Sequence, residues 1–397
     1  MSSNVTLTAA TRQNLLSLQD TASLTATTQN RLSTGLKVSS ALDNPVSFFT
    51  SQSLSQRSGD LSNLLDGISN GVQAIQAANQ GITSIQKLVD QAKSVANQAL
   101  STQITTTGTA STAYSAPAAA TTLNLYVNGA ATTVSLASTD TIDQAITKLN
   151  GAVGAGSFAK DTTGTKIVIN ASSDVEFQSS ADQTAIGFSG GTASSGPTYG
   201  TTTAVGQSSD LSVSGVSARA TLATQFNSLL TQIDQLANDA SFNGTNLIHG
   251  KGSNNDLTIN FNPKGNSNLT VTATDETSNG LGLTSITSTS AKTTTVGQGN
   301  FLLNADINTT LNSLTTASSQ LRTDASTFGS NLSVVQNRQD FSKNLINILD
   351  TGSSNLTAAD LNQEAANSQA LSTRQSLGIS ALSLANTAQQ GILQLLR

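Results

Sequence analysis

The C-terminal stretch, residues 360–397, constrains the fold more than any other part of the sequence. It contains no charged side chain from Gln375 to Leu396. Small or apolar residues recur there in steps of four and three, at Leu377, Ala381, Leu384, Ala388, Gly391 and Leu395. A second row widens this apolar face and consists of Ile379, Leu382, Ala385 and Leu393. The spacing predicts an α-helix that packs one face against another helix.

The same stretch is long enough to span a membrane, but its composition argues against that interpretation. Amide and hydroxyl side chains occur along its whole length, and no aromatic residues flank it. Each of these polar groups would be costly to leave unpaired in lipid. We therefore expect no membrane insertion, and a helix whose partner is either the N-terminal stretch or another subunit.

Composition excludes several classes of protein. Charged residues make up 10% of the 397 residues, against about 25% in ordinary soluble proteins. The formal net charge of −5 provides no basic field, so we expect no nucleic-acid partner. The absence of cysteine excludes disulfides, thiolate metal sites and a cysteine nucleophile. The N-terminal residues lack a basic start followed by an apolar core, so we expect no cleaved signal peptide. The protein is then either cytosolic or exported by a route that reads an uncleaved N-terminus.

Helical periodicity is also strong in the N-terminal third of the chain. Residues 1–34 form a helix-like pattern that ends at Gly35, and Asp43 and Asn44 precede Pro45 as a helix cap would. The clearest pattern follows over 61–99, where apolar residues keep the three-four spacing throughout. Its glycines each lower helix stability by about 1 kcal/mol. This helix therefore needs packing partners along its length.

The middle of the chain has a different pattern. Residues 123–136 resemble a hairpin turning at Asn128 and Gly129, 141–150 a helix, and 166–169 and 174–177 two strands. Residues 178–208 are polar and glycine-rich, which is typical of a loop. Helical periodicity returns over 216–240, a hairpin is predicted around Pro263, and a last long helix is predicted from Ile307 to an end at Gly352.

The expected fold is mainly α with a β-rich insertion. Long helices from both termini would form an antiparallel bundle or coiled-coil rod, with a small α+β outer domain between them. The expected boundaries are 1–45 for an N-terminal core helix, 46–100 for a rod helix, 101–208 for the outer domain, 209–300 for a rod helix with a β-hairpin, 301–354 for a C-terminal rod helix, and 355–397 for a C-terminal core helix.

Four sequence motifs together resemble bacterial flagellin. They are RLSTGLKVSSALD at 31–43, DGISNGVQAIQ at 66–76, FNGTNL at 242–247 and RQSLGISAL at 374–382. They occur in the order known for the family, and the resemblance covers roughly 1–100, 210–262 and 300–397. Residues 121–177 also resemble a small repeat of flagellin outer domains.

The resemblance implies a subunit of the flagellar filament that is exported unfolded by the flagellar type III apparatus and is therefore secreted and extracellular. It implies a homopolymer, with an export chaperone at the C-terminal helix and the filament cap and junction proteins as further partners. Low-charge termini rich in alanine, serine and glutamine fit segments that order on assembly. The residues expected to pack subunits together are Leu15, Leu18, Leu32, Leu377, Ile379, Leu382, Leu384, Ile392 and Leu395. The family-signature turn is Phe242, Asn243 and Gly244.

The sequence also departs from the family's pattern. Residues 43–49, DNPVSFF, replace an acidic stretch followed by Ala-Ala-Gly, and the insertion at 101–208 lies between the two N-terminal rod helices. The segment that corresponds to the innate-immune receptor site of enteric flagellins has Gln91, Lys93 and Ser94. Gln91 stands where the family has arginine, so a bidentate donor is lost. We expect weak activation of that receptor.

No enzymatic or cofactor-binding constellation is predicted. His249 is the single histidine, so no metal site or catalytic pair based on histidine can be completed, and a turn residue is the simpler interpretation. No cofactor is expected. Three alternatives to a filament subunit remain open: a stable monomer with an intramolecular coiled coil, a hook–filament junction protein, and a surface adhesin or glycan-binding module through 101–208.

Overall fold

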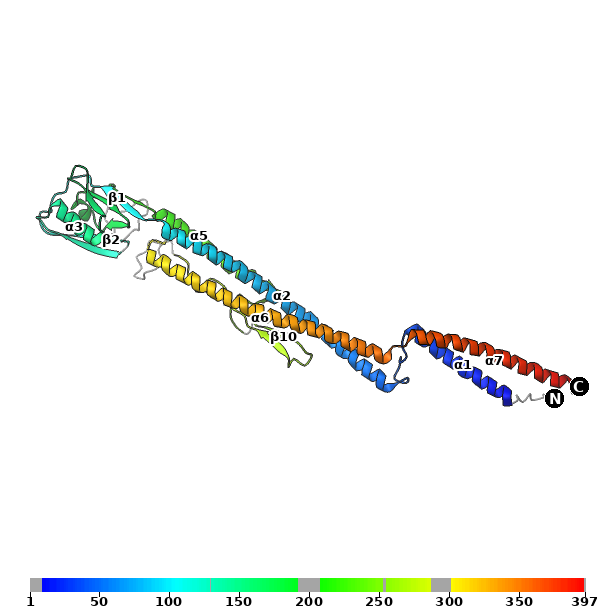
Figure 1. Cartoon of the computed structure of the whole chain (residues 1–397). Helices are drawn as coiled ribbons and strands as arrows, with labels where there is room; N and C mark the ends of the chain where they lie inside the picture. The colour runs from blue at the N-terminus through cyan, green and yellow to red at the C-terminus, as the bar shows by residue number, and fades with distance from the viewer. Residues whose placement is uncertain (1–8, 129, 192–207, 253–254, 287–300, 396–397) are drawn as a thin grey trace. The chain divides into compact units, whose positions relative to one another are not determined.

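The computed structural model describes residues 9–128, 130–191, 208–252, 255–286 and 301–395. They form two compact units. The first unit comprises Met1–Ser69, Asn260–Asn268 and Gln336–Arg397, and the second comprises Asn70–Ile259 and Leu269–Val335. The expected fold class is confirmed, because long helices lie toward both ends of the chain and the strands lie in the middle (Figure 1).

In the first unit, α1 (Ala9–Thr34) and α7 (Leu361–Leu395) lie side by side and antiparallel (Figure 1). Helix α1 ends as predicted, because Gly35 takes a φ of +69° and its N–H donates to Arg31 O at 2.8 Å. The N–H of Lys37 then donates to Thr357 O, and the N–H of Ala359 donates to Gly35 O, both at 2.8 Å. These bonds tie the end of α1 to the start of α7.

The long helices α2 (Pro45–Ser101) and α6 (Asn304–Thr357) also run antiparallel (Figure 1). Helix α2 begins as predicted at proline, and the Ser47 N–H donates to Asn44 Oδ1 at 3.1 Å. In the first unit the Ser353 hydroxyl lies 2.8 Å from the hydroxyl oxygens of both Ser51 and Ser55. Hydroxyl contacts therefore join the two helices where an apolar contact would be usual.

The predicted end of a helix at Gly352 is wrong. Helix α6 continues through it to Thr357. A Cβ atom on Gly352 would lie 3.5 Å from Leu54 Cδ1, so this glycine lies where the two helices approach each other. It is not a left-handed cap, and glycine is tolerated in a helix interior when packing compensates for its cost.

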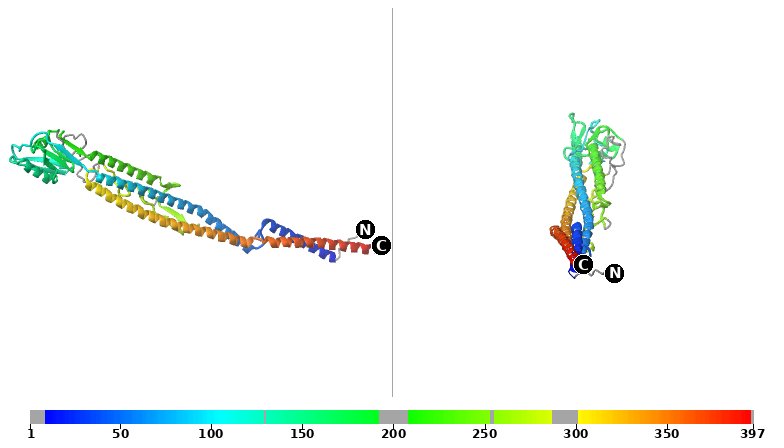
Figure 2. Two further views of the ribbon diagram at one scale, coloured as in Figure 1. Left: turned by 45° about the horizontal axis from the view of Figure 1, so that its top comes forward. Right: turned by 90° about the vertical axis from the view of Figure 1, so that its right-hand side faces the viewer.

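In the second unit, α2 packs against α5 (Val216–Asp239) and α6 (Figure 2). The predicted apolar face of α2 is confirmed, and Ile75, Ile82 and Val89 have no exposed surface. Two of its glycines have a packing role that the sequence did not reveal. A Cβ on Gly71 would overlap Ile259 Cδ1, and a Cβ on Gly81 would lie 2.6 Å from Ala240 Cβ. Both glycines therefore permit close approach of neighbouring segments.

Arg219 on α5 joins the ends of three helices in the second unit. Its side chain is 3% exposed. Its Nε donates to Thr102 O at 2.8 Å just beyond the end of α2. Its Nη1 donates to Leu302 O at 3.0 Å and its Nη2 to Asn304 Oδ1 at 2.8 Å at the start of α6. Burial lowers the pKa of this guanidinium, and the carbonyl oxygens around it compensate for the lost hydration.

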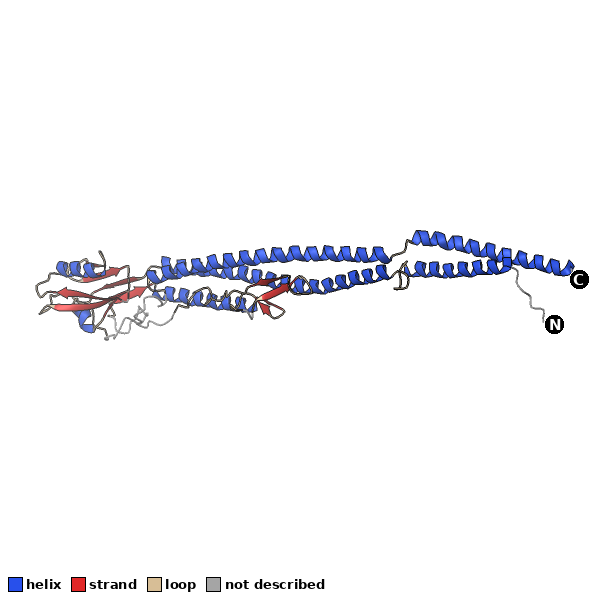
Figure 3. Ribbon diagram, turned by 90° about the horizontal axis from the view of Figure 1, so that it is seen from below, coloured by secondary structure: helices blue, strands red, loops and turns tan. Residues whose placement is uncertain are grey.

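The strands between residues 105 and 214, in the second unit, form two sheets around one apolar core (Figure 3). One sheet consists, in spatial order, of β4 (Phe158–Lys160), β5 (Ile167–Ala171), β1 (Thr105–Thr109) and β7 (Leu211–Ser214). The other consists of β3 (Ala130–Leu136), β2 (Thr121–Val127) and β6 (Val175–Phe177). The predicted hairpin is confirmed as β2 (Thr121–Val127) and β3 (Ala130–Leu136). The two other predicted strands correspond to β5 (Ile167–Ala171) and β6 (Val175–Phe177). The predicted helix is α3 (Ile142–Val153), which starts with a capping box between Thr141 and Gln144.

Several elements of this region were not predicted. They are β1 (Thr105–Thr109), β4 (Phe158–Lys160), α4 (Ser180–Thr184) and β7 (Leu211–Ser214). The prediction of a loop over 178–208 is therefore wrong at α4, and residues 192–207 lie outside the described part. Strand β1 lacks the alternating apolar residues by which the other strands were predicted, because it consists of threonine and glycine. Its pairing with β5 and β7 holds it in the sheet.

Two short hairpins complete the described chain. Strands β8 (Ser241–Phe242) and β9 (Thr245–Asn246) flank one turn. Strands β10 (Leu257–Asn260) and β11 (Asn268–Val271) form the hairpin predicted around Pro263. No helix among the described residues is long and apolar enough to cross a membrane.

Candidate assembly surface

The contact between α1 and α7 is made by two stripes of residues in heptad spacing. On α1 the buried or half-buried residues are Thr11, Asn14, Leu18, Thr21, Thr25, Thr28 and Arg31. On α7 they are Glu364, Ser368, Leu371, Gln375, Gly378, Leu382, Ala385 and Gly391. From Thr11 to Thr28 on α1 and from Glu364 to Ala385 on α7, these positions alternate steps of three and four, as in a coiled-coil seam. Most of them are polar or small, so the pair buries little apolar surface between its helices.

Large apolar side chains lie on the outer faces of the same two helices. Leu15 is 43% exposed, Leu377 is 66% exposed and Leu384 is 73% exposed. The others in this group are Leu16, Leu24, Leu32, Leu361 and Ile379. Burying one such side chain contributes about 1.5–3 kcal/mol. The terminal helices therefore leave unburied the side chains that could stabilise them most.

The structure separates the predicted packing residues into three groups. Leu15, Leu32, Leu377, Ile379 and Leu384 are exposed, so the part of the predicted row from Leu377 to Ala388 does not face α1. Leu18 and Leu382 are half-buried, and the Leu18 Cδ2 atom would meet a Cβ on Gly378 at 2.9 Å. The side chains of Ile392 and Leu395 lie outside the described part.

Sequence reasoning missed Leu16, Leu24 and Leu361 as members of the exposed group. The signal that could have found them is the stripe of threonines at heptad-like spacing on α1, which consists of Thr11, Thr21, Thr25 and Thr28. Once that stripe is assigned to the contact with α7, leucines on the other faces are necessarily outside it.

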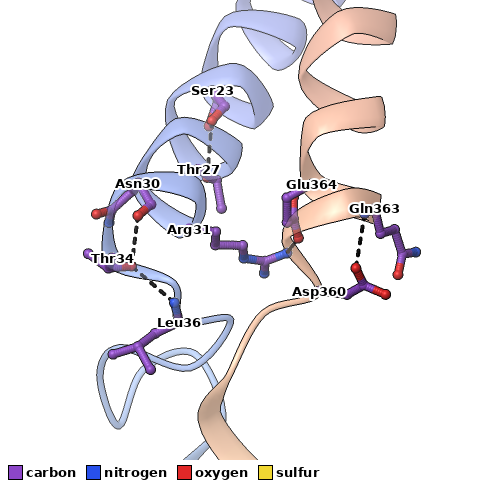
Figure 4. A network of polar contacts seen from close by, with 9 residues as sticks. All are labelled: Ser23, Thr27, Asn30, Arg31, Thr34, Leu36, Asp360, Gln363 and Glu364. Carbon is purple, nitrogen blue, oxygen red and sulfur yellow. Dashed lines mark hydrogen bonds and ion pairs between the residues drawn. The ribbon is translucent and has the colours of Figure 1, made fainter.

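A polar network fixes the start of α7 beside the end of α1 (Figure 4). Arg31 Nη1 lies 3.2 Å from Glu364 Oε1. One turn earlier, Asp360 Oδ1 accepts from the N–H groups of Asn362 at 3.0 Å and Gln363 at 3.2 Å. Asp360 is therefore the N-cap of α7, and its negative charge also favours the positive end of the helix dipole.

The predicted family-signature turn is a two-residue hairpin turn. Asn243 and Gly244 connect β8 to β9 with φ values of +49° and +80°, the sign that a type I′ turn requires at both positions. Phe242 pairs with Thr245 across it. The Asn246 Nδ2 atom donates to Ala237 O at 2.8 Å, which satisfies a carbonyl at the C-terminal end of α5.

The predicted receptor segment lies on an exposed face of α2. Gln91, Lys93 and Ser94 are all exposed. Lys93 Nζ donates to Thr315 Oγ1 on α6 at 3.4 Å, so the only cation of this group is engaged within the chain. His249 is an exposed bend residue. Within the described residues, no group of three His, Asp or Glu side chains could hold a metal ion.

Two of the buried carboxyl groups of the second unit have a strongly raised pKa. Glu276 has no exposed surface, and burial, assisted by the nearby Asp324, raises its pKa to about 7. Asp174 is 3% exposed, and burial together with the charge of Glu176 raises its pKa to about 7. Both groups are therefore easier to keep protonated in the folded unit than in the unfolded chain.

Comparison with known proteins places both ends of the chain in one family. Residues 3–125 match the bacterial flagellin N-terminal helical region, and residues 311–396 match the bacterial flagellin C-terminal helical region. Flagellin FljO of Caulobacter vibrioides is 36% identical over 192 residues, which cover 48% of this chain and 63% of that protein. A flagellin of Brucella melitensis is 30% identical over 184 residues, which cover 44% of this chain and 61% of that protein.

A flagellin C of Rhizobium meliloti is 42% identical over a shorter stretch of 77 residues, which covers 19% of this chain and 24% of that protein. The chain thus spans somewhat less than two thirds of the length of the first two relatives. The first region covers α1 and α2 and continues into β2, and the second covers most of α6 and all of α7, so the helices that carry the exposed leucines lie within the matched regions. The chain therefore belongs to the bacterial flagellin family.

Proposed function

We propose that this chain is a structural subunit of the bacterial flagellar filament and polymerises through α1 and α7. The observation that carries the proposal is the row of exposed leucines and isoleucine on these two helices, including Leu377, Ile379 and Leu384. A helix pair that buries mainly polar and small side chains between its members needs further partners to be stable in water. Other copies of the same pair supply such partners.

The exposed residues also favour an open assembly. They occupy several faces of α1 and α7, so one copy offers different surfaces to different neighbours. Contacts between unlike surfaces extend into a helical polymer unless the rotation closes a ring. We infer that Leu15, Leu18, Leu32, Leu377, Ile379, Leu382, Leu384, Ile392 and Leu395 contribute to these contacts. The boundaries expected at 1–45 and 355–397 delimit the polymerising part.

Export and accessory partners form the second part of the proposal. The subunit leaves the cell through the flagellar type III apparatus and acts in the extracellular filament. Before export, the apolar face of α7 is the surface that an export chaperone would cover, because a long exposed apolar stripe promotes aggregation. The filament cap and junction proteins contact the same terminal helices.

The test compares the intact chain with a truncated chain that consists of residues 46–354. Both are examined by negative-stain electron microscopy with sheared filament seeds. We expect long filaments from the intact chain and none from the truncated chain. An intact chain that only caps hook ends would identify a junction protein, and one that never assembles on seeds would overturn the proposal.

We also infer weak activation of the innate-immune receptor that recognises enteric flagellins. Gln91 offers one amide in place of a guanidinium fork, and Lys93 is already engaged with Thr315. A reporter assay with purified monomer tests this inference. We expect a weak signal that rises in a Gln91→Arg variant, and strong activation by the unaltered monomer would overturn it.

A further inference from the structure

The first unit contains a groove of about 650 Å³ that the terminal helices do not form. It lies between α2, the tip of the β10–β11 hairpin and α6. The side chains that matter for the argument are Arg57 and Leu61 on α2, Phe261 and Lys264 on the hairpin tip, and Arg338 and Phe341 on α6. We refer to this feature as the cationic groove.

The cations of this groove have no partner of opposite charge within the chain. Among the described residues, no carboxylate lies within ion-pair distance of Arg57, Lys264 or Arg338. Asp60 is the one carboxylate among the lining residues, which leaves an excess of positive charge. The Arg338 guanidinium lies 5.6 Å from the centre of the Phe261 ring. This cation–π contact holds the charge in place without neutralising it.

The groove is also partly apolar. Phe341 lies at its edge and is 59% exposed, whereas Leu61 within it is buried. A large exposed aromatic side chain beside fixed cations is typical of a surface that a protein partner covers. A small polar ligand would leave Phe341 in water.

The distribution of charge along the chain indicates which partner fits. The first unit holds nine of the 18 basic residues and eight of the 23 acidic residues. The second unit holds the other nine basic and fifteen acidic residues, a formal net charge of −6. A copy of this chain therefore carries a surface of the sign that the groove attracts.

Two carboxylates of the second unit are available for such a contact. Asp90 on α2 and Asp239 at the end of α5 are exposed. Neither side chain has a hydrogen bond or an ion pair in the described part of the chain. Other acidic residues of this unit are committed within it, as Asp234 is to the Ser278 N–H at 2.7 Å.

We propose that the cationic groove seats the acidic surface of the second unit of another copy, with Asp90 and Asp239 as its charged contacts. This proposal rests on the proposed filament function and adds a contact outside the terminal helices. The terminal helices supply the apolar part of the assembly energy, and the groove sets how far one copy is displaced from the next.

The first test reverses the charge of the groove in an Arg57→Glu, Arg338→Glu variant. Its control is Lys343→Glu, which makes a similar change on exposed α6 surface outside the groove. Circular dichroism checks that both variants fold. We expect the critical concentration for seeded assembly to rise about tenfold or more in the groove variant and to stay unchanged in the control. A folded groove variant that assembles like the unaltered chain overturns the proposal and leaves the filament function standing. Failure of the unaltered chain to assemble overturns both.

The second test pairs the groove variant with an Asp90→Lys, Asp239→Lys variant. In each variant alone, the groove and the surface that it would contact on the next copy carry charges of the same sign. In a mixture in which the two variants alternate, each groove meets a surface of opposite charge. We expect filaments from the mixture at a lower total concentration than from either variant alone. A mixture that assembles no better than its components overturns the assignment of Asp90 and Asp239.

A third measurement covers the case in which the groove variant does not fold. A photo-crosslinking amino acid replaces Lys264 in the full chain, and filaments grown from seeds are irradiated. We expect cross-linked peptides between copies that map to 70–259 or 269–335. Cross-links confined to the same copy, or to the terminal helices of another copy, overturn the proposal.

Discussion

Arg31 and Glu364 lie 333 residues apart in the sequence, and Arg31 Nη1 is 3.2 Å from Glu364 Oε1. The pair joins the last turn of α1 to the first turn of α7. The Glu364 side chain is 10% exposed, and its Oε2 atom has no hydrogen-bond partner in the described structure. Arg31 is therefore the main compensation for a nearly buried negative charge.

We predict that Arg31→Ala weakens assembly more than Glu364→Gln does. The first change leaves the carboxylate without its partner, whereas the second removes the charge and keeps an acceptor. Because Arg31 itself is partly exposed, the expected loss is about 1 kcal/mol, which is a several-fold rise in critical concentration. Arg12→Ala, at an exposed position on α1, is the control. Equal critical concentrations for Arg31→Ala and Arg12→Ala would contradict this prediction.

Some glycines on α2 lie against neighbouring segments, whereas others have free space where a Cβ atom would be. Gly81 has Ala240 Cβ and Ile248 Cδ1 at 2.6 Å from the position of an added Cβ, whereas Gly67 has nothing within 4 Å. We predict that Gly81→Ala destabilises the second unit by about 1–3 kcal/mol through overpacking. Gly67→Ala should stabilise the helix by up to about 1 kcal/mol. Urea unfolding of the monomer checks both, and a stabilising Gly81→Ala would show that the close approach is not required.

The buried Glu276 predicts how stability depends on pH. Its folded pKa is raised to about 7 from an ordinary value of 4.5, so the folded unit binds more protons than the unfolded chain between these values. The stabilisation is complete at low pH and is lost as pH rises through 7. We expect the free energy of unfolding to fall over this window, and Glu276→Gln to reduce the slope.

Asp174 changes stability in the same direction, so a smaller slope should remain in the Glu276→Gln variant. Asp66→Asn, at an exposed position on α2, serves as the control and should leave the slope unchanged. Urea unfolding at a series of pH values between about 5 and 8 measures this slope, because that range includes the raised pKa of about 7. A Glu276→Gln variant with the slope of the unaltered chain would contradict the assignment.

The parts of the fold that the sequence predicts are those in which apolar residues carry the contact. Along α2, Ile75, Ile82 and Val89 recur at helical spacing and are fully buried. The hairpin of β2 and β3 was predictable because alternating apolar residues flank Asn128, which takes a φ of +47°. In both cases local pattern and tertiary packing agree.

The parts that escaped prediction are held by polar or small residues. The seam between α1 and α7 uses Thr21, Thr28 and Gly378, and sequence periodicity assigns leucines to that role instead. Strand β1 has no apolar alternation, and its place follows from long-range pairs such as Thr106 with Ala171. Gly352 lies within α6, with Leu54 packed beside it. None of these contacts leaves a local signal in the sequence.

The central claim is that the exposed apolar face of the terminal helices drives polymerisation, and Leu384 tests it most directly. The measurement is the critical concentration for seeded assembly of Leu384→Asp, with Leu384→Met as the matched control. The claim predicts that Leu384→Asp forms no filaments while its monomer keeps the unfolding behaviour of the unaltered chain, and that Leu384→Met assembles normally. Normal filaments from Leu384→Asp, at the critical concentration of the unaltered chain, would contradict it.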